Sequence, residues 1–423
     1  MACSYDPVVQ DLKDFIYRYD DRRDDFFKAI ISAKDINNDG AEEMCLENID
    51  TLEDYFRFCN DMLRWVPRVD TPGDALFRKL LVFYWIFNQP DVGKYQTSII
   101  PENAGVDPKW LSYWQVLYVR TLGCFLDTRE SACGIESFYS NCIYNKDAAL
   151  WQDRPQGGWA SFNQFFARRW KDIDVARPLS QADLLDDVIV SIADSRFGET
   201  FPVEDGNVVI IKGIEWPIAK LLQSVADDFK DGYFMHAFLS PADYHRQHAP
   251  VSGVVLEAKV IPELVYLQVT KDQKAGLVAD RGLVVKKPLM SERRLKDLIA
   301  SGGKKLRSLI AGVEKDVRAV VAPDEPGYQW CQTRGLIMIQ TEKYGKIAVL
   351  PIGMAQVSSV VLTVEKGQKI EKGEEISYFQ FGGSDVVLVF EKPVDFSVKQ
   401  GDRCNVRTRI ATFRGVPASE IKN

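Results

Sequence analysis

The sequence has 423 residues, of which 46% are hydrophobic and 27% are charged, and its formal net charge is −7 at pH 7. We expect two domains, because single hydrophobic cores stop growing at roughly 250–300 residues. The acidic balance argues against a nucleic-acid-binding protein, which usually carries a basic surface. The longest purely apolar run, residues 80–87, is far shorter than the ~20 residues that span a bilayer, and the N-terminus lacks a secretion signal, so a cytoplasmic protein is predicted.

The first 150 residues show the periodicity of amphipathic helices. Apolar residues recur three and four positions apart within residues 8–19, 51–66 and 110–125. Thr51 or Asp50 is the expected N-cap of the second helix. Asp107-Pro108 predicts the start of the third, because a capping carboxylate there precedes a proline in the first turn. We therefore predict a helical N-terminal domain over residues 1–150.

A stretch rich in proline and glycine at 151–160 is typical of a linker, and after it the pattern changes to short β-branched runs. These runs predict strands at 188–192, 208–211, 253–260, 283–285, 336–339, 347–350 and 357–364. Lys-Gly at 366–367 and again at 372–373 suggests two tight turns around a short strand. The expected fold class is α+β, with a mostly antiparallel β catalytic domain over residues 151–423 and a C-terminal part like a barrel sandwich.

One segment of the predicted β domain differs in composition. Residues 286–318 contain ten Lys or Arg and four Asp or Glu, interspersed with leucine and isoleucine. A solvated helical insertion is the favoured interpretation. A membrane-surface element and a mobile lid over a site are the alternatives.

The cysteine and histidine patterns limit the chemistry. Eight cysteines without Cys-x-x-Cys spacing indicate neither a zinc site nor a disulfide framework. The three histidines, His236, His245 and His248, lie within thirteen residues. His-x-x-His spacing can place two imidazoles on one metal ion, but no cysteine or further histidine lies nearby, and we predict no metal. The other interpretation is acid–base catalysis, because imidazole titrates near neutrality and can activate a serine.

A Gly-Gly-Ser stretch at 382–384 separates an aromatic run, 376–381, from an apolar run, 386–390. The first interpretation is a hairpin or a turn from strand to strand. The second is chemical. A serine that follows glycine can attack the carbonyl carbon of the preceding residue, because glycine has no Cβ to obstruct the approach. The Gly383–Ser384 amide would become an ester, and elimination would leave a pyruvoyl group at the new N-terminus.

Several motifs, in the same order along the chain, resemble those of the phosphatidylserine decarboxylase family. The motifs are Phe-Asn-Gln-Phe-Phe-Ala-Arg-Arg-Trp at 162–170, Ala-Arg-Pro at 176–178, Ala-Asp-Ser at 193–195, Ser-Pro-Ala-Asp-Tyr-His-Arg-Gln-His-Ala-Pro-Val-Ser-Gly at 240–253 and Phe-Gly-Gly-Ser at 381–384. The helical extension resembles a soluble branch of the family that contains fungal L-tryptophan decarboxylases of the psilocybin pathway.

The resemblance implies a role for each matching residue. Ser384 becomes the pyruvoyl group, and cleavage after Gly383 gives the fragments 1–383 and 384–423, which stay associated. Asp194 and His248 match the pair that activates this serine. His245 matches the histidine of the decarboxylation step. His236 lies outside the motif, and we interpret it as a packed or hydrogen-bonded histidine.

Two positions depart from the family pattern. Asp385 stands where Thr or Ser is more common, and a carboxylate there could slow self-cleavage or repel a substrate carboxylate. In the stretch Cys-Gln-Thr-Arg at 331–334, only Arg334 matches, as a substrate-binding residue.

The resemblance implies a pyruvoyl-dependent carboxy-lyase that needs no pyridoxal phosphate. The substrate amine would form a Schiff base with the pyruvoyl group, which accepts the electrons released as CO₂ leaves. A free amino acid, such as an aromatic one, is the favoured substrate, and phosphatidylserine at a membrane surface is the alternative. An unprocessed, non-catalytic binding protein is a third hypothesis. A homodimer is implied by the resemblance alone.

Overall fold

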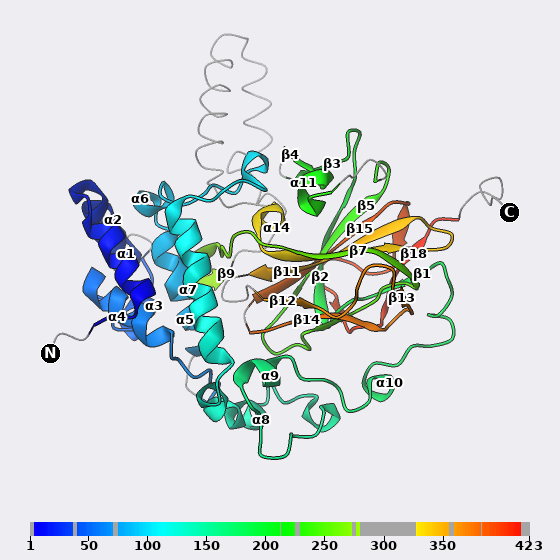
Figure 1. Ribbon diagram of the computed structural model, residues 1–423, viewed down its shortest axis with the longest axis horizontal. Coiled ribbons are helices and arrows are strands. Elements are labelled where there is room, and N and C mark those ends of the chain that lie inside the picture. Colours follow the sequence, from blue (N-terminus) through cyan, green and yellow to red (C-terminus); the bar gives the residue numbers. More distant parts are fainter. Residues whose placement is uncertain are drawn as a thin grey trace, which may run out of the picture.

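The computed structural model describes residues 4–36, 40–70, 75–211, 213–224, 229–272, 276–279, 327–354, 359–381 and 383–415. The predicted strand at 283–285 and the basic segment 286–318 lie outside the described residues. A helical N-terminal region is followed by a sheet-rich region, which confirms the predicted α+β class (Figure 1).

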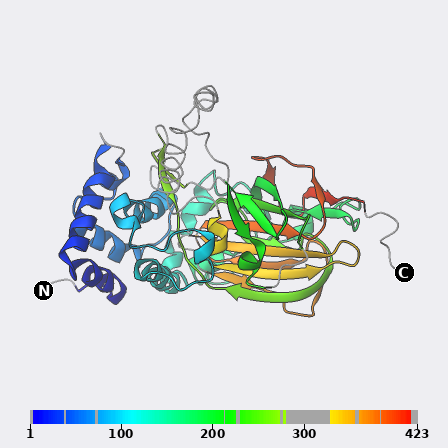
Figure 2. The same ribbon diagram turned by 90° about the horizontal axis from the view of Figure 1, so that it is seen from above.

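The helical region stands beside one end of the sheets (Figures 1 and 2). Its α-helices are α1 (Pro7–Tyr17), α2 (Asp20–Lys34), α3 (Glu43–Leu46), α4 (Leu52–Met62), α5 (Ala75–Phe87), α6 (Pro90–Gly93), α7 (Trp110–Leu126) and α8 (Glu136–Ser140). Thr51 forms a reciprocal capping box with Asp54 at the start of α4, which confirms the predicted N-cap.

The predicted start of a helix at Asp107-Pro108 is wrong. Helix α7 begins at Trp110, and its N-cap is Lys109. The Lys109 N–H donates to Thr97 Oγ1 at 2.7 Å, and the residue has an extended backbone. This bond to a preceding loop keeps the chain extended past the proline, so the helix starts later than the local signal indicates.

The sheet-rich region contains four short helices and eighteen strands among its described residues. The helices are α9 (Phe162–Phe166), α10 (Ile173–Ala176), α11 (Ile218–Leu222) and α14 (Tyr328–Cys331). The strands are β1 (Val188–Val190), β2 (Ser195–Pro202), β3 (Val208–Ile211), β4 (Ile214–Pro217), β5 (Tyr233–Leu239), β6 (Arg246–His248), β7 (Gly253–Ile261), β8 (Val269–Asp272), β9 (Gly276–Ala279), β10 (Arg334–Gln340), β11 (Lys346–Met354), β12 (Val360–Leu362), β13 (Lys369–Ile370), β14 (Glu375–Phe379), β15 (Gly383–Phe390), β16 (Val394–Phe396), β17 (Arg403–Cys404) and β18 (Arg409–Phe413).

The strands form one large sheet and several small ones. The eight-stranded sheet has the order β13-β7-β10-β11-β15-β5-β2-β17, and two three-stranded sheets have the orders β12-β14-β6 and β1-β18-β16. All the pairings in these sheets are antiparallel. The predicted tight turns are confirmed on both sides of β13, where Gly367 and Gly373 have φ of +89° and +82°.

The hairpin interpretation of the Gly-Gly-Ser stretch is wrong. Strand β14 pairs with β12 and β6, whereas β15 pairs with β11 and β5, so the chain passes from one sheet to another here. Residues 385–390 of β15 are all buried. A continuous apolar run of this kind suits a central strand covered on both faces, and an exposed hairpin arm would alternate in polarity.

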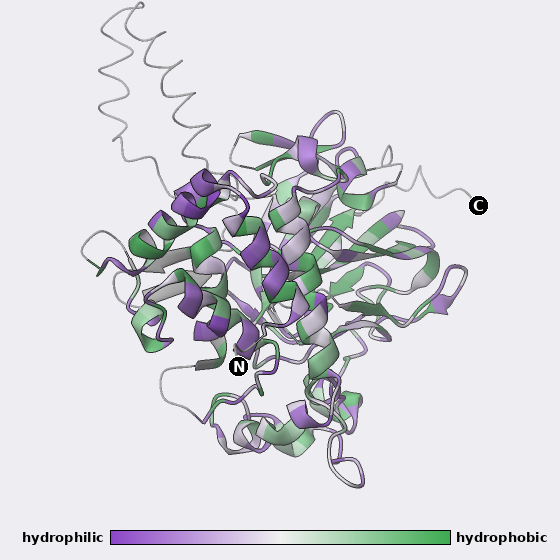
Figure 3. Ribbon diagram, turned by 60° about the vertical axis from the view of Figure 1, so that its left-hand side comes forward, coloured by the Kyte–Doolittle hydropathy of each residue, from purple (hydrophilic) through white to green (hydrophobic). Residues whose placement is uncertain are grey.

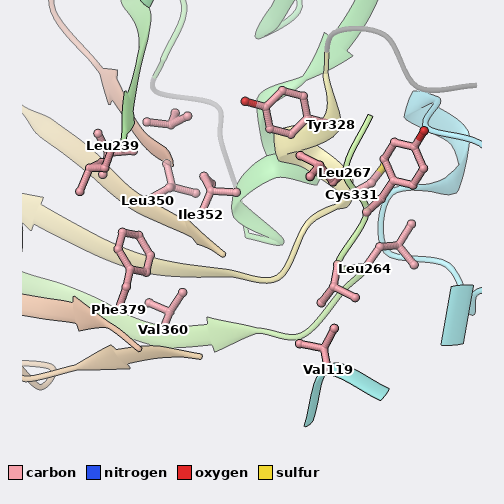
Figure 4. Packing of buried hydrophobic residues seen from close by; sticks show 14 of the residues in the cluster. Val119, Leu239, Leu264, Leu267, Tyr328, Cys331, Leu350, Ile352, Val360 and Phe379 are labelled. Carbon is pink, nitrogen blue, oxygen red and sulfur yellow. The ribbon is translucent and has the colours of Figure 1, made fainter. Parts of the chain in front are cut away.

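The helices and sheets share one hydrophobic core. Buried apolar side chains from Val8 to Phe413 form a single cluster, and hydrophobic residues gather in the sheets (Figure 3). Val119 of α7 and Leu264 both belong to this cluster (Figure 4), and Tyr84 of α5 donates a hydrogen bond to the Val265 carbonyl at 2.7 Å. The helical region therefore packs directly on the sheet-rich region, and the domain boundary at residue 150 stays a prediction.

Candidate active site

The Gly383–Ser384 step lies in the middle of the large sheet. In β15, Ser384 is opposite Gly353 of β11 on one side and Leu239 of β5 on the other. Just before the step, the buried ring of Phe381 packs edge-on against Phe166 of α9, with a centroid distance of 5.3 Å. The chain is therefore held on both sides of this step, by aromatic packing before it and by two ladders after it.

His245 lies close to this step. Its fully buried ring stacks on Phe166 with centroids 3.8 Å apart, and it hydrogen-bonds to the backbone of Ser240 and Pro241. Ser240 directly follows Leu239, the ladder partner of Ser384. Burial, with a smaller contribution from the nearby Arg168 guanidinium, lowers the pKa of His245 to about 3. The imidazole is therefore neutral at neutral pH, because burial disfavours its charged form.

His248 lies at the other end of β6, opposite Glu375 of β14. Its Nδ1 is 2.8 Å from the Gly373 carbonyl oxygen and must donate to it, so Nε2 accepts from the Tyr244 hydroxyl at 3.2 Å. Burial lowers the pKa of His248 to about 4, and the bond to Gly373 opposes part of this effect. His248 also lines a cleft of about 410 Å³, which gives this histidine an opening to solvent.

Asp194 is held by an ion pair. Arg177 Nε is 3.0 Å from Oδ1 and Nη2 is 2.5 Å from Oδ2, and the Val406 N–H donates to Oδ1 at 2.8 Å. Among the described hydrogen bonds, none joins Asp194 to His248. The two are connected through the backbone, because the His248 N–H donates to the carbonyl of Ile192, two residues before Asp194. The predicted pair is therefore close in the fold, while each side chain has other partners.

Arg334 is completely buried at the start of β10. Its guanidinium donates to the carbonyl oxygens of Leu221 at 2.7 Å, Gln332 at 2.8 Å and Lys220 at 3.0 Å. Burial lowers its pKa to about 10, which the carboxylate of Glu263 opposes. Two of these bonds satisfy carbonyls of α11 and the third satisfies the carbonyl at the C-cap of α14, so a substrate contact would have to replace one of them. Its substrate role stays a prediction.

Sequence reasoning missed a buried polar cluster next to the cleavage step. The carboxylate of Asp385 accepts a hydrogen bond from the Tyr328 hydroxyl and lies 3.2 Å from His236 Nε2. His236 is thus the hydrogen-bonded histidine that the sequence predicts. The Asp385 carboxylate, which could slow self-cleavage, is therefore bound by Tyr328 and His236. A single acidic residue directly before the apolar run 386–390 was the available signal, but nothing in the sequence identified Tyr328 as its partner.

Two properties of the described part of the chain bear on other classes of function. Within it, no group of three or more His, Cys, Asp or Glu side chains could hold a metal ion. No described helix is both long and apolar enough to span a membrane.

Comparisons with known proteins agree on one family. The sequence model of the family described as "Phosphatidylserine decarboxylase" matches residues 162–412. The chain is 28% identical over 313 residues to the phosphatidylserine decarboxylase proenzyme of Fusobacterium nucleatum, which covers 73% of this chain and 83% of that protein. It is 24% identical over 331 residues to that of Clostridium botulinum strain Alaska E43, which covers 76% and 88%.

A eukaryotic relative is much longer. The phosphatidylserine decarboxylase proenzyme 3 of Schizosaccharomyces pombe is 29% identical over 263 residues, which cover 62% of this chain and only 22% of that protein. The matched family region, 162–412, contains Asp194, His245, His248 and Ser384 and excludes α1 to α8.

Proposed function

The chain belongs to the phosphatidylserine decarboxylase family, and from this premise we propose that it cuts itself between Gly383 and Ser384 and then acts as a pyruvoyl-dependent decarboxylase. The observation that carries the proposal is the surroundings of the Gly-Gly-Ser stretch. It lies in the matched region, in a central strand, with a neutral buried histidine beside it. The name "proenzyme" of the relatives supports it further, since a proenzyme is a precursor that must be processed.

Self-cleavage proceeds through bonds of the chain itself. The Ser384 oxygen attacks the carbonyl carbon of Gly383, the C–N bond breaks, and the Ser384 nitrogen takes up the proton, which leaves an ester. Loss of the Ser384 α-proton then expels the Gly383 carboxylate and leaves a dehydroalanine at position 384. Its enamine becomes an imine, and water releases ammonia from it to give the pyruvoyl group. A base is required at the first and second steps.

We propose Asp194 and His248 as the activating pair, following the family motif, and His245 as the residue that handles the proton in decarboxylation. The pyruvoyl group supplies a carbonyl that accepts the electrons released when CO₂ leaves. The buried rings of Phe162, Phe166 and Phe381 would keep water from this position. A buried, neutral His245 can exchange a proton there without a persistent charge.

We propose that the two fragments stay associated after cleavage. Strand β15 begins the C-terminal fragment and lies between β11 and β5, and β17 pairs with β2. Breaking one peptide bond leaves all these ladders intact. A homodimer and a cytoplasmic location remain predictions.

For the substrate, the names of the relatives favour phosphatidylserine over a free amino acid. The second candidate is a free amino acid, such as the aromatic substrate of the fungal branch, and one observation supports it. Trp65 of the helical region, outside the family match, reaches Phe381 with a centroid distance of 6.2 Å. The helical region thus adds an aromatic wall to the site.

Denaturing gels and mass spectrometry test the self-cleavage. The unmodified chain should give two fragments with a pyruvoyl group at position 384, and Ser384→Ala should give one band. A single band from the unmodified chain, with serine intact, would contradict the proposal. CO₂ release from phosphatidylserine micelles and from a panel of free amino acids then identifies the substrate. Release from phosphatidylserine alone, or from amino acids alone, selects between the candidates.

His248→Gln and His245→Gln separate the two proposed roles. We expect His248→Gln to slow self-cleavage. We expect His245→Gln to yield cut protein that releases little CO₂. The reverse pattern would exchange the two assignments.

A further inference from the structure

A chain of hydrogen bonds connects the helical region to the cleavage segment. The Phe381 N–H donates to Asn163 Oδ1 at 3.0 Å, and Asn163 Nδ2 donates to Asp127 Oδ1 at 3.0 Å. Asn163 is only 3% exposed, and the bond to Phe381 is buried. The buried amide of Asn163 therefore uses its oxygen to accept from Phe381 and its nitrogen to donate to Asp127 at the end of α7.

Helix stability does not account for the carboxylate of Asp127. Asp127 is the C-cap of α7, where the helix dipole disfavours a negative charge. Its carboxylate accepts the hydrogen bond from Asn163, and Gln380 Nε2 lies 3.5 Å from the same oxygen. An acidic residue at this unfavourable position thus reaches both α9 and the residue before Phe381.

The ring of Phe381 is also held, by three aromatic side chains. Trp65, Phe162 and Phe166 surround it, with centroid distances of 6.2, 5.1 and 5.3 Å. Trp65 and Asp127 both precede the family match at residue 162. The ring of Phe381 therefore contacts the helical region directly through Trp65, and its backbone N–H is connected to that region through Asn163 and Asp127.

These contacts bear on the geometry of cleavage. Only Gly382 and Gly383 separate Phe381 from Ser384, which the ladders to Gly353 and Leu239 hold in place. Glycine has the widest choice of backbone conformations, so two glycines do not hold the reacting carbonyl by themselves. An intramolecular attack is fast only when the reacting atoms are held in a near-attack arrangement. Fixing Phe381 restricts the two glycines from their N-terminal side.

We propose that Asn163, held by Asp127, is a positioning residue for self-cleavage, so that the helical region controls how fast the Gly383–Ser384 bond is cut. The inference rests on the proposed self-cleavage. The orientation of the amide is what matters: its oxygen must face the Phe381 N–H, and its nitrogen must face an acceptor oxygen at position 127.

An exchange of side chains tests this orientation. Asn163→Asp should slow cleavage by about tenfold to a hundredfold, because two carboxylates then face each other and displace the segment, and misplacement by about 1 Å costs on this order. Asp127→Asn should cut at close to the unmodified rate, since its amide oxygen can still accept from Asn163. The double variant Asp127→Asn/Asn163→Asp should recover the rate, because the new amide donates to the new carboxylate, which still accepts from Phe381. Cleavage is followed on denaturing gels after synthesis.

Asn141 provides a matched control. Its side chain also uses both ends, with Oδ1 2.9 Å from the Ile143 N–H and Nδ2 2.8 Å from the Val69 carbonyl oxygen, but it does not contact the cleavage segment. Asn141→Asp should lower the melting temperature and leave the cleavage rate unchanged. Melting temperatures of all variants are measured in the uncut Ser384→Ala background, which separates a slow rate from a lost fold.

The outcomes distinguish the inference from the proposed function. If the unmodified chain is never cut, self-cleavage itself is wrong. If it is cut and a folded Asn163→Asp variant is cut equally fast, the positioning role is wrong. If Asn163→Asp does not fold, the double variant decides: cleavage at the unmodified rate supports the inference, and slow cleavage by a folded double variant overturns it.

Discussion

Arg177 and Asp194 form a bidentate ion pair, in which Arg177 Nε is 3.0 Å from Asp194 Oδ1 and Nη2 is 2.5 Å from Oδ2. The side chains are only 7% and 2% exposed, and burial opposes the charge on Arg177 while Asp194 raises its pKa. The Arg177 guanidinium also lies over the Trp170 ring at 4.3 Å. Asp194 accepts from the Val406 N–H as well, so one carboxylate joins the family's Ala-Arg-Pro motif to the part of the chain that follows Ser384.

Arg177→Ala should destabilise the protein strongly. Removing one partner leaves a buried carboxylate without its counter-charge, which typically costs about 3–5 kcal/mol. Urea unfolding in the Ser384→Ala background measures the loss without interference from cleavage.

A matched control for this prediction is Arg154, which also makes two contacts to one carboxylate, Glu136, but at the surface. These side chains are 48% and 69% exposed, so Arg154→Ala should cost at most about 1 kcal/mol. Equal losses from the two variants would contradict the view that Asp194 depends on its buried partner.

The two buried histidines predict how stability depends on pH. Burial lowers the pKa of His245 to about 3 and that of His248 to about 4 from the ordinary 6.5. Below about pH 6.5 the unfolded chain binds protons at both imidazoles and the folded chain does not, so the free energy of unfolding must fall as the pH falls toward 4. Each histidine contributes up to about 1.4 kcal/mol per pH unit.

Urea unfolding between about pH 7 and pH 5 checks this dependence. In the Ser384→Ala background, His245→Gln and His248→Gln should each reduce the slope of stability against pH, because glutamine does not titrate. Carboxylates contribute the same slope to parent and variant, so the difference reports the histidine. A slope that neither substitution changes would show that the imidazoles are not held neutral in the fold.

Local patterns predicted much of the fold. The runs 208–211, 253–260, 336–339 and 347–350 all fall within strands, and the Thr51 cap is present. These features depend on a few neighbouring residues, so the chain itself carries the signal. The predicted start of α7 was wrong because a hydrogen bond from Lys109 to Thr97, twelve residues away, outweighed the local capping signal.

The residues of the candidate site could be predicted only where they belong to a motif of the family. Ser384, His245, His248 and Asp194 were found by resemblance, which gives positions along the chain and no contacts. Residues that contact the neighbours of Ser384 from far along the chain were missed. Asn163 is 218 positions from Phe381, and Tyr328 is 57 positions from Asp385. The two strands around Gly-Gly-Ser likewise looked like a hairpin because their partners, β6 and β11, lie elsewhere in the sequence.

Gly198 of β2 provides a test of how tightly the cluster behind the cleavage strand is packed. A Cβ at this position would lie 2.7 Å from the His236 carbonyl oxygen and 2.8 Å from His236 Nδ1. Neither the carbonyl oxygen nor Nδ1 can move away easily, because the carbonyl belongs to β5 and the ring is held by Asp385 and Tyr328. Gly198→Ala should therefore cost about 1–3 kcal/mol.

The matched control is Gly123 of α7, where an added Cβ would meet nothing within 4 Å. There the substitution should stabilise the protein by up to about 1 kcal/mol, because alanine favours a helix interior over glycine. Both variants are compared by urea unfolding in the Ser384→Ala background. A Gly198→Ala variant as stable as its parent would mean that His236 can move away from Asp385 at no cost, and the cluster would then not hold β15 in place. A smaller loss from Gly198→Ala when His236 is replaced by alanine would assign the difference to the imidazole, because the contact with the backbone carbonyl oxygen remains in that background.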